Sequence, residues 1–148
     1  MTSPSILIVE ARFYPDISDA LLAGARAVFE AEGVRFERAE VPGALEIVPA
    51  ITLAEASGHG FDGYVALGCV IRGETGHYDI VAGESARGLT DLAVSRALAI
   101  GNGILTVDTH QQAMVRASVD GRDKGGDAAR ACLALIALRR RFQAQRNG

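Results

Sequence analysis

The feature that most constrains the fold of this chain is a regular alternation of short apolar runs with longer stretches of helical periodicity. Four apolar runs are strand candidates: residues 6–9, 34–41, 63–71 and 104–107. Five helices are expected between and after them: residues 16–32, 46–57, 79–100, 109–117 and 126–145. Strands that alternate with helices form a parallel sheet with right-handed crossovers and helices on both faces. The sequence therefore predicts an α/β domain with a four-stranded parallel sheet, and one domain over residues 1–148.

The strand candidates differ in polarity, which predicts their places in the sheet. The run 63–71 is almost wholly apolar and is typical of a strand covered on both faces. We expect 6–9 and 104–107 to be central as well, and the more polar 34–41 to lie at an edge. Gly101 is expected to end the helix over 79–100, since glycine is favoured just past a helix C-terminus.

Composition excludes several classes of protein. The 148 residues are 49% hydrophobic and 22% charged, which is typical of a globular domain rather than a disordered chain. The net charge of −3 lacks the basic surplus of a nucleic-acid-binding protein. We expect neither a membrane span nor a secretory signal, because no apolar run approaches the required length. Cys69 and Cys132 are expected to be buried free thiols in a reducing cytoplasm.

Two patterns that suggest cofactor or metal chemistry are discounted. Residues 58–63 match G-x-G-x-x-G, but a dinucleotide loop follows a strand and opens a helix, whereas this segment follows a helix and opens a strand. We interpret it as a turn. His59 and His110 sit on separate turns, and neither belongs to a metal-binding motif. We therefore expect no metal site and no dinucleotide-binding loop.

The loop after the third strand candidate is the richest in chemistry. Residues 68–79 read GCVIRGETGHYD and lead from a strand into a helix N-terminus, whose free N–H groups can hold an anion. Gly73 and Gly76 allow close approach of the backbone to a ligand. His77 supplies a group that titrates near neutral pH. A loop histidine alone is more often a cap or a surface residue, but the surrounding anion-binding loop favours an acid–base role.

Other candidates follow the remaining strands, where ligands of such sheets bind. Glu46 either interacts with a helix dipole or accepts hydrogen bonds from a polyol, and the sequence leaves both open. Phe13 can stack on a planar ring, although a packed loop aromatic is commoner. Arg116 and Lys124 are solvated charges if they act alone, and become phosphate or substrate ligands beside an anion-binding loop.

Taken in order along residues 6–138, these motifs resemble the 6,7-dimethyl-8-ribityllumazine synthase family. The resemblance rests on five segments: Arg12-Phe13, VPGALEI at 41–47, GCVIRGETGHYD at 68–79, GILTVDTHQQAMVRA at 103–117, and Lys124-Gly125. It implies a flavodoxin-like three-layer α/β/α fold and a cofactor-free cytoplasmic enzyme of riboflavin biosynthesis. That enzyme condenses 5-amino-6-(D-ribitylamino)uracil with 3,4-dihydroxy-2-butanone 4-phosphate and releases phosphate.

The resemblance also implies a role for each matching residue. His77 would be the acid–base residue. The substrate-binding residues would be Phe13, Ala44, Leu45, Glu46, Cys69, Val70, Ile71, Asn102 and Lys124. The phosphate-binding residues would be Glu74, Thr75 and Arg116.

Two departures from the family pattern bear on assembly. Asn102 stands where the family often carries an aromatic residue that a neighbouring subunit contributes to the site. The resemblance implies a homopentamer, which some members of the family assemble further into an icosahedral shell. Residues 118–123 replace a frequent KAG-N pattern with charged side chains, which favours the free pentamer over the shell. The alternatives are an inert flavin or lumazine carrier and a shell-forming scaffold. His77 together with Arg116 favours retained chemistry, because a carrier needs neither.

Overall fold

The predicted strands form one parallel sheet in the order β2-β1-β3-β4. The computed structural model describes residues 2–147. The strands are β1 (Ser5–Ala11), β2 (Arg35–Val41), β3 (Gly63–Ile71) and β4 (Ile100–Val107). The helices are α1 (Pro15–Ala31), α2 (Ile47–Ala56), α3 (His77–Arg96), α4 (His110–Ala117) and α5 (Lys124–Asn147), with a 3-10 turn η1 (Ala44–Glu46) before α2.

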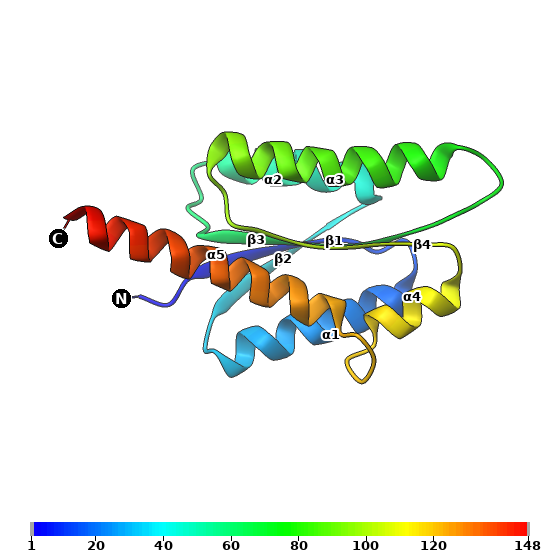
Figure 1. Cartoon of the computed structure of the whole chain (residues 1–148), viewed down its shortest axis with the longest axis horizontal. Helices are drawn as coiled ribbons and strands as arrows, with labels where there is room; N and C mark the ends of the chain where they lie inside the picture. Colours follow the sequence, from blue (N-terminus) through cyan, green and yellow to red (C-terminus); the bar gives the residue numbers. More distant parts are fainter. Residues whose placement is uncertain (1, 148) are drawn as a thin grey trace.

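Helices cover both faces of the sheet and give the predicted three-layer α/β/α arrangement (Figure 1). Helices α2 and α3 lie on one face, and α1, α4 and α5 lie on the other. Strand β1 is buried on both faces because its side chains alternate between two cores. Ile6 and Ile8 pack in the core under α1 and α5, whereas Leu7 and Val9 pack in the core under α2 and α3. The α/β fold class predicted from the sequence is confirmed.

The position predicted for the fourth strand is wrong. β4 is an edge strand that pairs with β3 alone, while β2, predicted at an edge, forms the opposite edge. Burial alternates along β4: Gly101 and Leu105 are buried, whereas Asn102 and Thr106 are exposed. The apolar residues 104–107 are typical of a central strand. In the structure, α5 covers one face of β4 much more fully than α3 covers the other, which leaves alternate side chains of β4 exposed.

The boundary between α3 and β4 also differs from the prediction. The helix ends at Arg96, and its cap residue Ala97 adopts the left-handed conformation with φ of 53°. Gly101 lies inside β4 and does not end the helix. A Cβ atom there would lie 1.9 Å from the carbonyl oxygen of Ala128, so close packing of α5 against β4 requires the glycine.

Several local predictions can be compared directly with the structure. A capping box begins α4: the Thr109 side chain accepts a hydrogen bond from the backbone N–H of Gln112, and the Gln112 side chain accepts one from the backbone N–H of Thr109. Residues 58–63 connect α2 to β3, as expected for a turn. Arg139 on α5 donates hydrogen bonds to the carbonyl oxygens of Asp62 at 2.5 Å and Ala97 at 3.5 Å. Within residues 2–147, no helix is both long and apolar enough to cross a membrane.

Candidate active site

A cavity of about 370 Å³ opens at the carboxyl edge of the sheet, where the loops after β1, β2 and β3 meet. Its walls come from these three loops and from the first turns of α3. The lining residues are Phe13, Tyr14, Pro42, Gly43, Ala44, Leu45, Glu46, Cys69, Val70, Ile71, Gly73, Thr75, His77, Tyr78 and Val81. Sheets of this type bind ligands at this edge, so the cavity is the candidate active site.

The last residues of β3 present an open backbone edge to the cavity. Pairing between β1 and β3 stops at Glu10 and Leu67, whereas pairing between β3 and β4 continues to Ile71. Beyond Leu67, the side of β3 that faced β1 therefore borders the cavity. Main-chain groups along this edge can bind a planar, polar ring by hydrogen bonds.

Burial of the Cys69 side chain argues against a nucleophilic role. The thiol is half-buried, and desolvation raises its pKa to about 11. A thiol with such a pKa is almost entirely neutral near pH 7, and the neutral form is a poor nucleophile. Cys69 therefore contributes to the wall through its position on β3.

The turn between β1 and α1 supplies an aromatic wall. Phe13 is 70% exposed although it is large and apolar. Its ring meets the edge of Tyr14, with the two ring centroids 4.9 Å apart. A ring left open to a cavity can stack on a planar ligand, and burying it there removes apolar surface from water.

The loop after β2 brings a carboxylate to the same cavity. Ala44, Leu45 and Glu46 form η1, so Glu46 lies in a 3-10 turn just before α2 rather than inside that helix. A Cβ atom added to Gly43 would lie 3.2 Å from Glu46 Oε1, which shows that the carboxylate folds back over this glycine. The carboxylate is exposed at the cavity wall, where it can accept hydrogen bonds from hydroxyl groups.

The loop between β3 and α3 places His77 in the first turn of a helix. α3 begins at His77, two residues earlier than expected, and the backbone N–H of His77 donates a hydrogen bond to Thr75 Oγ1 at 3.3 Å. The first N–H groups of a helix lack partners within the helix, so this end of α3 attracts anions. A histidine beside an anion site can transfer protons to or from a bound phosphorylated substrate.

Arg72 holds this loop in place on its outer side. Its guanidinium carbon lies 4.2 Å from the centre of the Tyr78 ring, and Arg72 Nε donates to Asp108 Oδ1 at 3.0 Å. Tyr78 lines the cavity, although the sequence did not single it out. Tyr14 and Val81 were also missed. Only their positions in the sequence could have indicated that these residues line the cavity. Tyr14 and Tyr78 directly follow the predicted residues Phe13 and His77, and Val81 lies one helical turn beyond His77.

Four residues expected at the site do not line this cavity. Glu74 is exposed on the loop between two lining residues. Asn102 lies on the exposed side of β4 and accepts a hydrogen bond at 2.9 Å from a backbone N–H of its own strand. Arg116 donates at 3.1 Å to a carbonyl oxygen of its own helix, and Lys124 Nζ lies 3.6 Å from a carboxylate of α5.

The described residues offer no cluster suited to a metal ion. Within residues 2–147, no group of three or more His, Cys, Asp or Glu side chains is arranged to hold one. The chemistry that this cavity can support from its own side chains is stacking, hydrogen bonding, anion binding and proton transfer.

These features define a class of protein: a three-layer α/β protein with a ligand site at the carboxyl edge of a parallel sheet. A protein-family comparison narrows this class, since residues 3–140 match the model of the family described as 6,7-dimethyl-8-ribityllumazine synthase. The chain belongs to this family.

Proteins named 6,7-dimethyl-8-ribityllumazine synthase are similar to the chain over most of its length. The protein from Methylorubrum populi is 61% identical over 139 residues, which cover 91% of this chain and 82% of that protein. The protein from Bartonella tribocorum is 57% identical, with 94% of this chain and 92% of that protein covered. The protein named 6,7-dimethyl-8-ribityllumazine synthase 1 from Rhizobium meliloti is 56% identical, with 95% of each chain covered.

Proposed function

We propose that this protein condenses 5-amino-6-(D-ribitylamino)uracil with 3,4-dihydroxy-2-butanone 4-phosphate to form 6,7-dimethyl-8-ribityllumazine and phosphate. The observation that carries the proposal is one cavity that combines an aromatic wall, a carboxylate and a histidine at a helix N-terminus, in a chain of this family. The reaction needs two substrates held together and protons moved near neutral pH.

The ring substrate would occupy the side of the cavity nearest β1 and β3. Phe13 stacks on the pyrimidine, and the open backbone edge at Cys69, Val70 and Ile71 hydrogen-bonds its polar atoms. Ala44 and Leu45 flank the same substrate, and Glu46 accepts hydrogen bonds from the ribityl hydroxyls. The carboxylate is suited to this role because ionised oxygens are strong acceptors.

The phosphorylated ketone would bind at the start of α3. The Thr75 hydroxyl and the backbone around Glu74 hold the phosphate, with the helix dipole favouring negative charge there. The amine of the ring substrate attacks the ketone to form an imine with loss of water, phosphate is eliminated, and a second condensation closes the ring with loss of a second water. His77 transfers protons during imine formation and phosphate loss, because it lines the same cavity two residues after Thr75.

Arg116, Asn102 and Lys124 would complete the site from an adjacent subunit. All three lie outside the chain's own cavity, on β4, α4 and α5, and a second copy would bring them to it. We propose a homopentamer in which each site is shared across one interface, with Arg116 pairing with the phosphate. The charged segment 118–123 favours the free pentamer over an icosahedral shell. The two free thiols suit the reducing cytoplasm, where we place the protein.

Turnover distinguishes the enzyme from an inert carrier or a scaffold on the same fold. The test is release of phosphate from the ketone when both substrates are present with catalytic amounts of protein. We expect many equivalents of phosphate per chain, at a rate above the reaction without protein. Binding of lumazine with no more phosphate release than in buffer would favour the carrier.

A further inference from the structure

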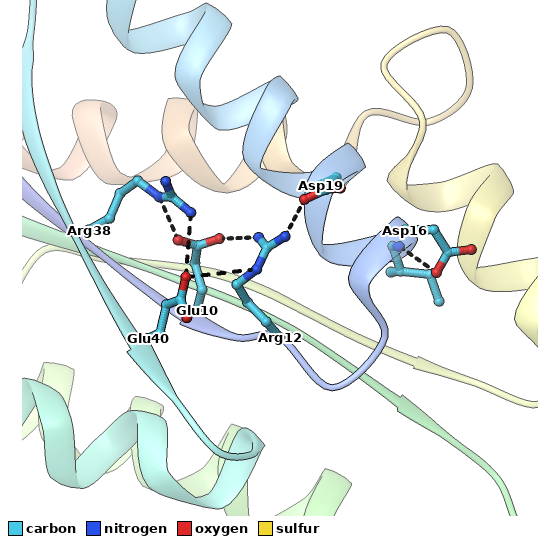
Figure 2. Close-up of polar contacts among 7 residues, drawn as sticks. Glu10, Arg12, Asp16, Asp19, Arg38 and Glu40 are labelled. Carbon is cyan, nitrogen blue, oxygen red and sulfur yellow. Dashed lines mark hydrogen bonds and ion pairs between the residues drawn. The ribbon is translucent and has the colours of Figure 1, made fainter.

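A buried carboxylate lies beneath the turn that carries Phe13. Glu10, near the end of β1, is 1% exposed. Its two oxygens are both paired: Arg12 Nη1 donates to Oε1 and Arg38 Nε donates to Oε2, each at 2.7 Å (Figure 2). An ionised carboxylate at such depth is stable only when it is paired, so the two guanidinium groups are required for its burial.

Arg12 joins three elements of the fold around this carboxylate. Besides Glu10 on β1, its guanidinium donates to Asp19 in α1 and lies 4.0 Å from Glu40 at the end of β2 (Figure 2). Arg12 itself is the first residue after β1 and directly precedes Phe13. One side chain thus holds the start of the β1–α1 turn to the sheet and to the helix.

Phe13 depends on this anchor because other interactions around it are few. Its side chain is 70% exposed, and the helix that follows has no side-chain cap at Tyr14. The backbone of the turn is therefore held at one end by the Arg12 guanidinium and at the other by the first turn of α1. If the guanidinium lost its hold, the ring would lose its fixed place at the cavity wall.

Arg38 contacts the same carboxylate without touching the turn. It lies within β2, whose backbone is held by pairing with β1, and Arg38 is the residue of β2 that lies opposite Ile8 of β1. Its guanidinium also lies 3.9 Å from Glu40. Arg12 and Arg38 therefore bond Glu10 at the same distance, 2.7 Å, but only Arg12 belongs to the segment that presents Phe13.

We infer that Glu10 and Arg12 are positioning residues for the planar substrate: the buried carboxylate fixes Arg12, and Arg12 fixes the turn that holds Phe13 at the cavity wall. The inference rests on the proposed function, because it assigns these residues to the binding of the ring substrate. A positioning role acts on that substrate and leaves the phosphorylated ketone and the proton transfer by His77 nearly unaffected.

The test compares Arg12→Gln with the matched control Arg38→Gln. Glu10→Gln is expected to change the KM for the ring substrate in the same direction as Arg12→Gln. Each arginine variant removes one of the two hydrogen bonds to Glu10, so both should lower the melting temperature, and Arg12→Gln should lower it further because it also loses the bond to Asp19. Arg12→Gln should raise the KM for the ring substrate by roughly tenfold, while kcat and the KM for the ketone stay within about twofold. Arg38→Gln should leave both KM values near wild type. An equal rise in both variants would overturn the inference.

A double-mutant cycle with Phe13→Ala shows whether Arg12 acts through Phe13. If it does, Arg12→Gln should have little further effect on ring binding once Phe13 is removed. A full tenfold effect in the Phe13→Ala background would overturn the inference.

The cycle is measured by calorimetry with the ring substrate alone, so its result does not depend on turnover. A wild-type protein that fails to bind the ring substrate would contradict the proposed function itself. Binding by wild type with additive effects in the cycle would contradict only the positioning role.

Discussion

The backbone N–H of His77 and the side-chain oxygen of Thr75 are joined by a hydrogen bond of 3.3 Å. This bond ties the proposed proton-transfer residue to the proposed phosphate-binding residue across two positions of the chain. It also fixes the Thr75 side chain at the start of α3, where helix N–H groups attract an anion. The histidine thus lies next to the place where phosphate would leave.

Replacing His77 tests its role in proton transfer. His77→Ala should lower kcat by roughly 10²- to 10⁴-fold, the contribution typical of a single acid–base group. The loss of kcat should lie at the low end of this range if the condensation already proceeds readily in water without a catalyst. His59→Ala is the control, because His59 lies in the loop before β3, at the opposite edge of the sheet, and should keep full activity. A His77→Ala variant with full turnover between pH 6 and 8 would contradict the role.

Arg116→Ala tests the assignment of the phosphate partner and the shared site together. Loss of a charge-assisted hydrogen bond costs about 1.5–3 kcal/mol, so the KM for the phosphorylated ketone should rise roughly ten- to a hundredfold. The KM for the ring substrate should change less, and inorganic phosphate should inhibit the variant more weakly. Arg96→Ala, at the far end of α3, is the matched charge control. Equal effects of Arg116→Ala on both substrates would indicate a structural role.

The two thiols predict how stability depends on alkaline pH. Burial raises the pKa of Cys69 to about 11 and that of Cys132 to about 12, from an ordinary value of 9.0. At a pH between the ordinary thiol pKa of 9.0 and the raised values, the folded protein keeps these protons and the unfolded chain loses them. The free energy of unfolding should therefore fall as pH rises above about 9.

Denaturant unfolding of wild type and Cys132→Ala at several pH values between 7 and 10.5 measures this effect. The variant should show a shallower fall above pH 9, whatever its stability at pH 7. Identical slopes in the two proteins would contradict a buried neutral thiol at position 132.

The state of assembly can also be tested in solution. A free pentamer of 15.5 kDa chains has a mass of about 78 kDa. Light scattering near neutral pH should give this value. A particle near a megadalton would contradict the free pentamer, and a species of one chain would contradict a site shared between subunits.

The sequence predicted the layers of the fold and the loops that form the cavity, because both follow from local patterns. Apolar periodicity separates strands from helices, and alternation then requires a parallel sheet whose ligand site lies at one known edge. Phe13, Glu46 and His77 were found in this way, each in the segment that leads from a strand into the next helix. The structure brings all three to one cavity.

Other features depend on contacts between distant segments and leave little trace in local sequence. Gly101 looked like a helix terminator, but the glycine is needed because the backbone of Ala128 passes directly over β4. The edge position of β4 follows from the order in which strands pair, which hydropathy does not encode. The paired burial of Glu10 was equally hidden, since Arg38 lies far along the chain from it.

The most direct test of the account is the absorbance of a new lumazine when the pure protein is mixed with both proposed substrates. We expect a lumazine spectrum to develop faster than in buffer, with one phosphate released per lumazine formed and with the rate reduced in His77→Ala. A rate no greater than that in buffer, from folded wild-type protein, would contradict the proposal that this cavity catalyses the condensation.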